Sequence, residues 1–153
     1  MCFRTISNDS CSIGGTFMIL ITGGKYQGRL KCAFDCGNYK EEDVFDFAKI
    51  NSAEYASSNK NFKTCKIWYN FQEYVRSLAL SGTDSWQIEN MMKKLVENNN
   101  PEIIIMAEVG AGVIPMNKSD VVFREASGRL SVYFAEGANE VYRMICGIRT
   151  KLK

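Results

Sequence analysis

Residues 17–30 read Phe-Met-Ile-Leu-Ile-Thr-Gly-Gly-Lys-Tyr-Gln-Gly-Arg-Leu and join an apolar run to a glycine-rich segment. The run at residues 17–21 is uninterrupted and rich in β-forming residues, which is typical of a strand buried on both faces of a parallel sheet. Glycines end the run, and residues 29–36 are expected to form a short helix. A strand, a glycine-rich loop and a helix in succession are the context in which phosphate-binding loops occur.

The glycine loop, residues 23–28, has the spacing G-x-x-x-x-G of such a phosphate-binding loop. Glycine allows the backbone to approach a phosphate closely and to present its N–H groups. The candidate phosphate-binding residues are Gly23, Gly24, Lys25, Gly28, Arg29 and Leu30. The same spacing also fits a plain structural turn between a strand and a helix, so both interpretations stay open.

Arg29 and Leu30 depart from the phosphate-binding pattern, which asks for lysine and then serine or threonine. The lysine reaches the β- and γ-phosphates, and the hydroxyl next to it holds magnesium. Arg29 keeps the positive charge in a different shape, and Leu30 cannot ligate a metal. The sequence therefore predicts a phosphate cradle whose catalytic parts are altered.

Composition describes an ordinary globular chain of 153 residues, 46% hydrophobic and 24% charged, with a net charge of +2. This length predicts one domain, and the scattered lysines give no indication of nucleic-acid binding. No apolar run approaches the roughly 18 residues that a membrane span needs. Residues 1–16 are polar and do not resemble a signal peptide. We expect them to be a loose extension before a domain at residues 17–153 of a cytoplasmic protein.

The chain has six cysteines and no histidine. The cysteines form no Cys-x-x-Cys pair, which favours reduced, mostly buried thiols over a metal site or a disulfide framework. The absence of histidine removes the commonest general base and any histidine nucleophile.

Apolar periodicity predicts alternating strands and helices, and therefore a mostly parallel α/β sheet flanked by helices in a single domain. Strands are expected at residues 17–21, 44–50, 103–106 and 140–146. Helices are expected at residues 29–36, 67–80, 86–97 and 122–134, and residues 51–63 are expected to be an exposed loop. We expect the last helix to be capped by Ser119 and Asp120 and to bend or split at Gly128.

Glu108 follows the strand expected at residues 103–106 and precedes a glycine-rich segment. In an open α/β sheet the functional groups gather at the carboxyl ends of neighbouring strands, so Glu108 is expected to face the same cleft as the glycine loop. A carboxylate there can hold magnesium or accept a substrate proton. A capping or salt-bridging glutamate fits the same sequence.

The C-terminal third carries four motifs: Glu-Val-Gly-Ala-Gly-Val-Ile-Pro, Phe-Arg-Glu-x-x-Gly-Arg-Leu, Ala-Asn-Glu-Val-Tyr and Cys-Gly-Ile-Arg-Thr-Lys-Leu-Lys. Together with residues 19–30 they resemble the adenosylcobinamide kinase/adenosylcobinamide-phosphate guanylyltransferases of cobalamin biosynthesis. The family pattern reads E-V-G-x-G-I-V-P, F-R-D-x-x-G, A-D-x-V and G-I-P-x-x-x-K, after an N-terminal I-L-V-T-G-G-x-x-S-G-K-S. The resemblance covers residues 108–153 without a gap and leaves residues 31–101 unaligned.

The resemblance implies a P-loop α/β fold and association into a homo-oligomer, a trimer. It implies ATP or GTP with magnesium as phosphoryl donor, an adenosylcobinamide-type corrinoid as acceptor, and a second step that transfers GMP. The matching nucleotide-site positions are Gly23, Gly24, Gly28, Glu108, Gly110 and Arg124. Glu108 and Arg29 are the candidate catalytic residues, and Glu108 is the candidate magnesium ligand.

Departures from the family pattern bear on activity. Besides Arg29 and Leu30, Val121 replaces a family arginine and Ser131 replaces a family asparagine. The family transfers GMP through a histidine in an H-R-x-x-R-P segment, and this chain has neither the segment nor a histidine. We therefore expect at most the kinase half of the activity. The alternatives are a catalytically silent homologue that binds nucleotide or corrinoid, and an unrelated small nucleotide-binding kinase.

Overall fold

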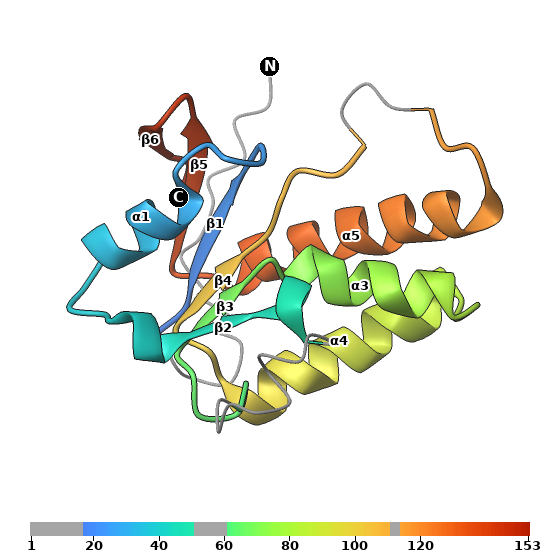
Figure 1. Ribbon diagram of the computed structural model, residues 1–153, viewed down its shortest axis with the longest axis horizontal. Helices are drawn as coiled ribbons and strands as arrows, with labels where there is room; N and C mark the ends of the chain where they lie inside the picture. Colours follow the sequence, from blue (N-terminus) through green and yellow to red (C-terminus); the bar gives the residue numbers. More distant parts are fainter. Residues whose placement is uncertain (1–16, 51–60, 111–113) are drawn as a thin grey trace, which may run out of the picture.

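A computed structural model describes residues 17–50, 61–110 and 114–153. The expectation of a loose extension at residues 1–16 and most of the loop expected at 51–63 lie outside these residues. The described chain forms one six-stranded sheet with helices on both faces (Figure 1). The strand order is β2-β3-β4-β1-β5-β6, and every neighbouring pair is parallel except β5 and β6. The predicted mostly parallel α/β fold is confirmed.

Short strands alternate with helices along the chain. The strands are β1 (Ile19–Gly23), β2 (Val44–Asp46), β3 (Ile67–Tyr69), β4 (Ile103–Ile105), β5 (Glu140–Ile145) and β6 (Ile148–Lys151). The α-helices are α1 (Arg29–Asp35), α3 (Phe71–Leu80), α4 (Ser85–Asn99) and α5 (Lys118–Gly137), and the 3₁₀ helices are η2 (Glu41–Asp43) and η3 (Phe47–Lys49). Helices α3, α4 and α5 cover one face of the sheet, and α1 covers the other (Figure 1).

Strand β1 lies inside the sheet, and the sheet separates the core into two parts, one on each face. Its side chains alternate, so Leu20 packs with α3, α4 and α5, while Ile21 packs against α1. The strand was predicted at residues 17–21 and begins two residues later, since Phe17 is 55% exposed. Strand β4 pairs in parallel with β1 and is fully buried, as its run of three isoleucines predicted.

The helix predicted at residues 67–80 is wrong in its first part, where Ile67–Tyr69 forms β3 instead. This segment pairs in parallel with β2 and with β4, and Ile67 and Trp68 are fully buried. Asn70 then adopts a left-handed conformation with φ 55°, and α3 begins at Phe71. Burial on both sheet faces therefore outweighed an apolar spacing that also suits a helix.

Two more boundaries differ from the prediction. The strand expected at 44–50 ends at Asp46, because the Asp46 carboxylate accepts a hydrogen bond from the Ala48 N–H and starts η3. Helix α5 is capped by Asn117, whose side chain accepts from the Asp120 N–H at 2.8 Å, rather than by Ser119 and Asp120. It also runs without a break through Gly128, which is exposed on the helix surface.

The strand predicted at 140–146 is confirmed as β5, which ends one residue earlier at Ile145. A tight turn at Cys146 and Gly147, both with positive φ, then leads into β6. The basic C-terminal segment thereby forms an antiparallel edge strand. Among the described residues, no helix has both the length and the apolar character to cross a bilayer.

Candidate phosphate site and adjoining pocket

The glycine loop connects the carboxyl end of β1 to α1, and both of its outer glycines are required by geometry. Gly23 has φ 141°, and a Cβ there would lie 2.5 Å from the carbonyl oxygen of Met144 on β5. Gly28 has φ 83° and stands immediately before α1. The loop is also tied to the turn after β5, since the Cys146 N–H donates to the Gln27 side-chain oxygen. Any larger residue at Gly23 therefore requires the loop or β5 to move.

Arg29 is buried at the start of α1 with only 3% of its surface exposed. Its guanidinium lies 5.9 Å from the ring centre of Tyr69, at the end of β3. The Nη1 atom has no hydrogen-bond partner among the residues that the structure describes. Burial lowers the pKa of Arg29, and the nearby Tyr69 and Glu73 oppose this effect. The side chain is a buried cation whose hydrogen-bonding capacity is not fully used, which is costly unless an anion joins it.

Leu30 is half-buried and packs into the core on the α1 side of the sheet. It brings no oxygen to the loop, so the hydroxyl that normally holds magnesium beside such a loop is missing here.

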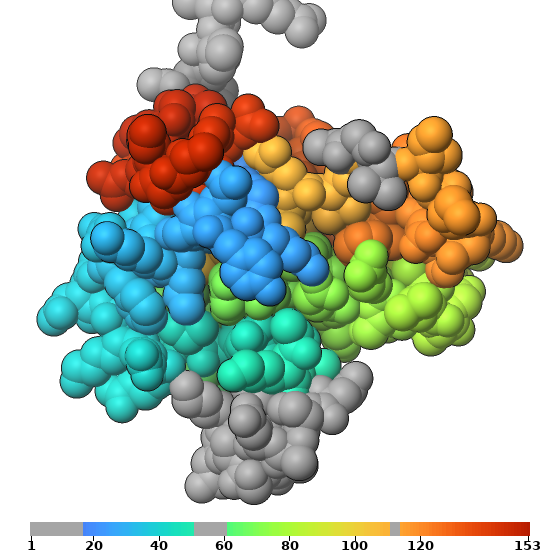
Figure 2. Space-filling model, turned by 45° about the horizontal axis from the view of Figure 1, so that its top comes forward, coloured from blue at the N-terminus to red at the C-terminus, as the bar shows by residue number. Residues whose placement is uncertain are grey.

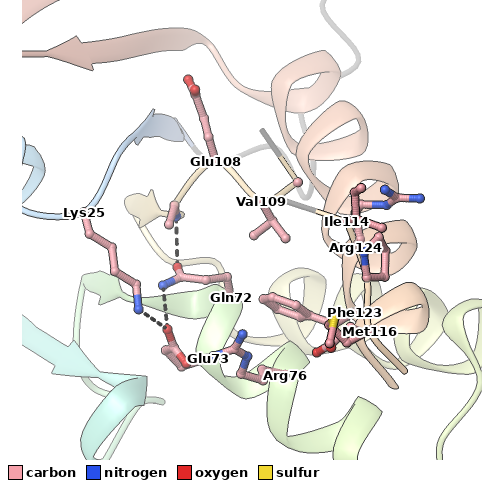
Figure 3. A pocket seen from close by; sticks show the side chains of 14 residues that line it. Lys25, Gln72, Glu73, Arg76, Glu108, Val109, Ile114, Met116, Phe123 and Arg124 are labelled. Carbon is pink, nitrogen blue, oxygen red and sulfur yellow. Dashed lines mark hydrogen bonds and ion pairs between the residues drawn. The ribbon is translucent and has the colours of Figure 1, made fainter. Parts of the chain in front are cut away.

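A pocket of about 410 Å³ adjoins the glycine loop. Figure 2 shows this side of the molecule, where the blue segment that contains the loop lies between the red C-terminal strands and the green α3 segment. The pocket is lined by Lys25 from the loop, by α3, by the segment after β4 and by the first turns of α5 (Figure 3). Apolar side chains such as Val109 and Phe123 provide part of its wall, which suits a ligand with an apolar body.

Helix α3 is attached to the end of β4 through a buried glutamine. Gln72 accepts a hydrogen bond from the Ala107 N–H at 2.9 Å, and its amide nitrogen lies 3.4 Å from a Glu73 oxygen. Glu73 also lies 3.4 Å from the Lys25 ammonium, as the dashed lines in Figure 3 show. Arg76, one turn further, lies over the ring of Phe123 at 4.9 Å. These contacts fix the charged side chains on the α3 side of the pocket.

Glu108 lies beside the first loop residue, as the shared-cleft argument predicted. Its N–H donates to the Gly23 carbonyl oxygen at 3.2 Å. Its two carboxylate oxygens accept from Nε and Nη2 of Arg143 on β5, at 2.6 and 3.0 Å. This contact raises the pKa of Arg143. In Figure 3 the Glu108 side chain points away from Lys25, Gln72 and Glu73.

The role of Glu108 as a magnesium ligand stays a prediction. Since Arg143 already occupies both Glu108 oxygens, a metal there would have to break this ion pair. No group of three or more His, Cys, Asp or Glu side chains within the described residues is arranged to hold a metal ion.

Gly110 and Arg124 meet at the far side of the pocket. Gly110 has φ 94°, and a Cβ there would lie 2.8 and 2.9 Å from the Arg124 side chain. The structure thus brings Lys25, Glu108, Gly110 and Arg124 to one pocket, while Arg29 and Leu30 do not line it.

Comparison with known proteins decides the family. Residues 65–152, more than half of the 153-residue chain, match the model of the family described as cobinamide kinase / cobinamide phosphate guanyltransferase. The chain belongs to this family. It is also 35% identical over 51 residues to the bifunctional adenosylcobalamin biosynthesis proteins CobU of Escherichia coli (strain K12) and Salmonella typhimurium (strain LT2). Each alignment covers 33% of this chain and 28% of the relative's length.

The part that matches the cobinamide kinase family runs from just before β3 to β6 and does not include the glycine loop. Sequence reasoning missed several side chains of this part. These are Tyr69, Gln72, Glu73 and Arg76, together with Arg143 on β5. The three residues Ile-Trp-Tyr followed by asparagine indicate a strand that stops, and this pattern was available in the sequence.

Proposed function

We propose that this protein is a divergent cobinamide kinase family member that binds the phosphates of ATP or GTP at the glycine loop. It retains at most the kinase half of the family activity, with an adenosylcobinamide-type corrinoid as the phosphoryl acceptor. The nucleotide and corrinoid assignments come from the family resemblance. Association into trimers belongs to the same proposal.

The unpartnered Nη1 of buried Arg29 carries this proposal. Burying a guanidinium nitrogen without an acceptor costs stability, and the 5.9 Å contact with Tyr69 offsets only part of this cost. A phosphate held by the loop supplies the missing acceptor, and a hydrogen bond between two charged groups is stronger than a neutral one. The loop geometry supports this role, because Gly23 and Gly28 allow a backbone path that other residues do not adopt readily.

Other side chains near the loop supply a further positive charge and apolar pocket walls. Lys25 is exposed and adds a second positive charge at the loop, where it pairs with Glu73. The pocket next to Lys25 offers apolar walls for the part of a substrate that carries the reacting group. Bound nucleotide supplies the phosphoryl group, and the chain binds and orients it.

A silent binding homologue is the second candidate, and Leu30 favours it. Phosphoryl transfer depends on positioning and on stabilising charge, so a loop without the magnesium-holding hydroxyl loses part of the catalytic apparatus. The absence of histidine also removes the residue through which the family transfers GMP. This candidate retains nucleotide binding and has no turnover.

Calorimetric titration with ATP and with GTP, with and without magnesium, tests the proposal. We expect binding of at least one nucleotide with little dependence on the metal. Transfer of the labelled γ-phosphate to adenosylcobinamide then separates a kinase from a silent binder. Gly23→Ala is expected to abolish binding, because the new Cβ would meet the Met144 carbonyl oxygen.

Gly128→Ala is the matched control, because its Cβ would meet nothing within 4 Å on the surface of α5. It should leave nucleotide binding unchanged. If the unaltered protein binds neither nucleotide, the proposed function is wrong.

A further inference from the structure

We propose that Arg143, in addition to Arg29, contacts phosphates bound at this site. A bound phosphate takes the place of the Glu108 carboxylate as the partner of Arg143. The inference rests on the proposed function, since it requires phosphates at the glycine loop. It assigns a role to an arginine that neither the loop motif nor the C-terminal motifs include.

The contact between Arg143 and Glu108 has the geometry by which arginine recognises a planar or tetrahedral anion. Nε and Nη2, two donors on the same edge of the guanidinium, each bond one carboxylate oxygen, at 2.6 and 3.0 Å. The same fork binds two phosphate oxygens equally well. Glu108 therefore occupies a position that is already shaped for a phosphate.

The pair stands at the beginning of the glycine loop. Arg143 lies on β5 directly opposite Thr22 on β1, the residue before Gly23. Glu108 approaches from the other side of β1, where its N–H bonds the Gly23 carbonyl oxygen. The ion pair consequently spans β1 at the point where the chain leaves the sheet to form the loop.

Exposure makes this ion pair easy to exchange. The Arg143 side chain is 46% exposed and that of Glu108 is 31% exposed. Exposed ion pairs contribute little to stability, so replacing the carboxylate by another anion costs the fold little. A polyphosphate carries more charge than a carboxylate and competes for the fork.

Lys25, within the loop, also has a carboxylate partner, since Glu73 lies 3.4 Å from its ammonium. The exposed cations Lys25 and Arg143 thus each have a carboxylate partner, whereas buried Arg29 has a nitrogen without a partner among the described residues. The loop, the start of α1 and β5 contribute one cation each: Lys25, Arg29 and Arg143. When phosphate binds Arg143, the Glu108 carboxylate is released at the edge of the pocket.

Titration of tripolyphosphate in the presence of EDTA, followed by calorimetry, tests this inference on the full chain. Arg143→Met removes the fork and should weaken binding by roughly tenfold, the effect of losing one charged hydrogen-bonding group. Glu108→Gln removes the competing charge and should tighten binding about two- to fivefold, the range of an exposed ion pair. The variant with both changes should bind tripolyphosphate as weakly as Arg143→Met, because the guanidinium for which Glu108 and phosphate compete is absent.

Arg149→Met is the matched control. Arg149 lies on β6, next to β5, and packs over the ring of Tyr142, whose side chain belongs to the core on the α1 side. It should change tripolyphosphate binding by less than twofold. An equal loss in Arg149→Met and Arg143→Met would show a general charge effect and overturn the inference.

Two further results overturn it: unchanged binding by Arg143→Met, or weaker binding by Glu108→Gln. Arg143→Lys keeps the positive charge and loses the fork, so it should weaken tripolyphosphate binding by less than Arg143→Met does. If Arg143→Met does not fold, the affinity of Arg143→Lys tests the role of Arg143 instead. If the unaltered protein binds no tripolyphosphate, the proposed function itself fails. If it binds and Arg143→Met binds equally well, only the role of Arg143 is wrong.

Discussion

Arg29→Met should make the ligand-free protein more stable while removing its phosphate binding. The change keeps an unbranched side chain that packs into the same space, and it deletes a guanidinium that is 3% exposed and has one unpartnered nitrogen. A buried donor without an acceptor costs about 1–3 kcal/mol. The cation–π contact with Tyr69 at 5.9 Å offsets about 0.5–1 kcal/mol of this cost. We therefore expect the free energy of unfolding to rise by up to about 2.5 kcal/mol.

Thermal unfolding followed by circular dichroism measures this effect. For a domain of this size 1 kcal/mol corresponds to about 2–4 °C in Tm, so the variant should melt up to about 10 °C higher without ligand. Tripolyphosphate at saturating concentration should raise the Tm of the unaltered protein and leave that of Arg29→Met unchanged, because only a ligand that binds the native state stabilises it. The Tm values of the unaltered protein and of Arg29→Met should therefore approach each other or cross as the tripolyphosphate concentration rises.

A variant that is less stable by more than 1 kcal/mol and still binds tripolyphosphate would refute this reasoning. Arg29 would then be a structural residue whose packing outweighs its desolvation. Arg129→Met is a suitable control, because that arginine is exposed on α5 and does not line the pocket. It should shift the Tm little and leave the ligand response intact.

Three other outcomes are expected. The double change Arg29→Lys with Leu30→Ser restores the lysine and the hydroxyl of the usual loop, so magnesium-dependent nucleotide affinity should appear in calorimetry, and each single change should do less. No acid-labile phosphoramidate should form with labelled GTP, since the chain has no histidine, and detection of one on the purified chain would contradict this. Iodoacetamide at pH 8 should modify exposed Cys146 and spare Cys32, because burial raises the pKa of Cys32 to about 11; equal labelling by mass spectrometry would show that Cys32 is accessible.

Strong local patterns were sufficient to predict the centre of the fold. Strands β1 and β4 are short apolar runs that stop at polar or glycine residues, and the structure confirms both and their parallel pairing. Their adjacency places the Glu108 N–H against the Gly23 carbonyl oxygen, so this proximity followed from the fold class, while a shared nucleotide cleft stays a prediction. Strand β3 did not follow, because Ile67 and Trp68 lead directly into a helix whose apolar spacing can be extended backwards over them.

The charged partners of the site could not be predicted from the sequence. Arg143 lies 35 residues after Glu108, and only the register of β5 beside β1 brings the two side chains together. Glu73 meets Lys25 for a similar reason, since α3 begins at the end of β3, a strand that the sequence analysis had assigned to a helix. Pairs of this kind depend on tertiary arrangement, which periodicity within one segment does not encode.

The loop glycines and Arg29, at the start of α1, differ in how strongly they support a functional role. Gly23 is required whether or not a phosphate binds, because the Met144 carbonyl oxygen leaves no room for a Cβ. A silent homologue would therefore keep Gly23 for packing alone. Burying Arg29 carries a desolvation cost that an apolar side chain of similar length would avoid. The decision between a structural turn and a phosphate site thus depends on Arg29, whose removal should affect stability and binding in opposite directions.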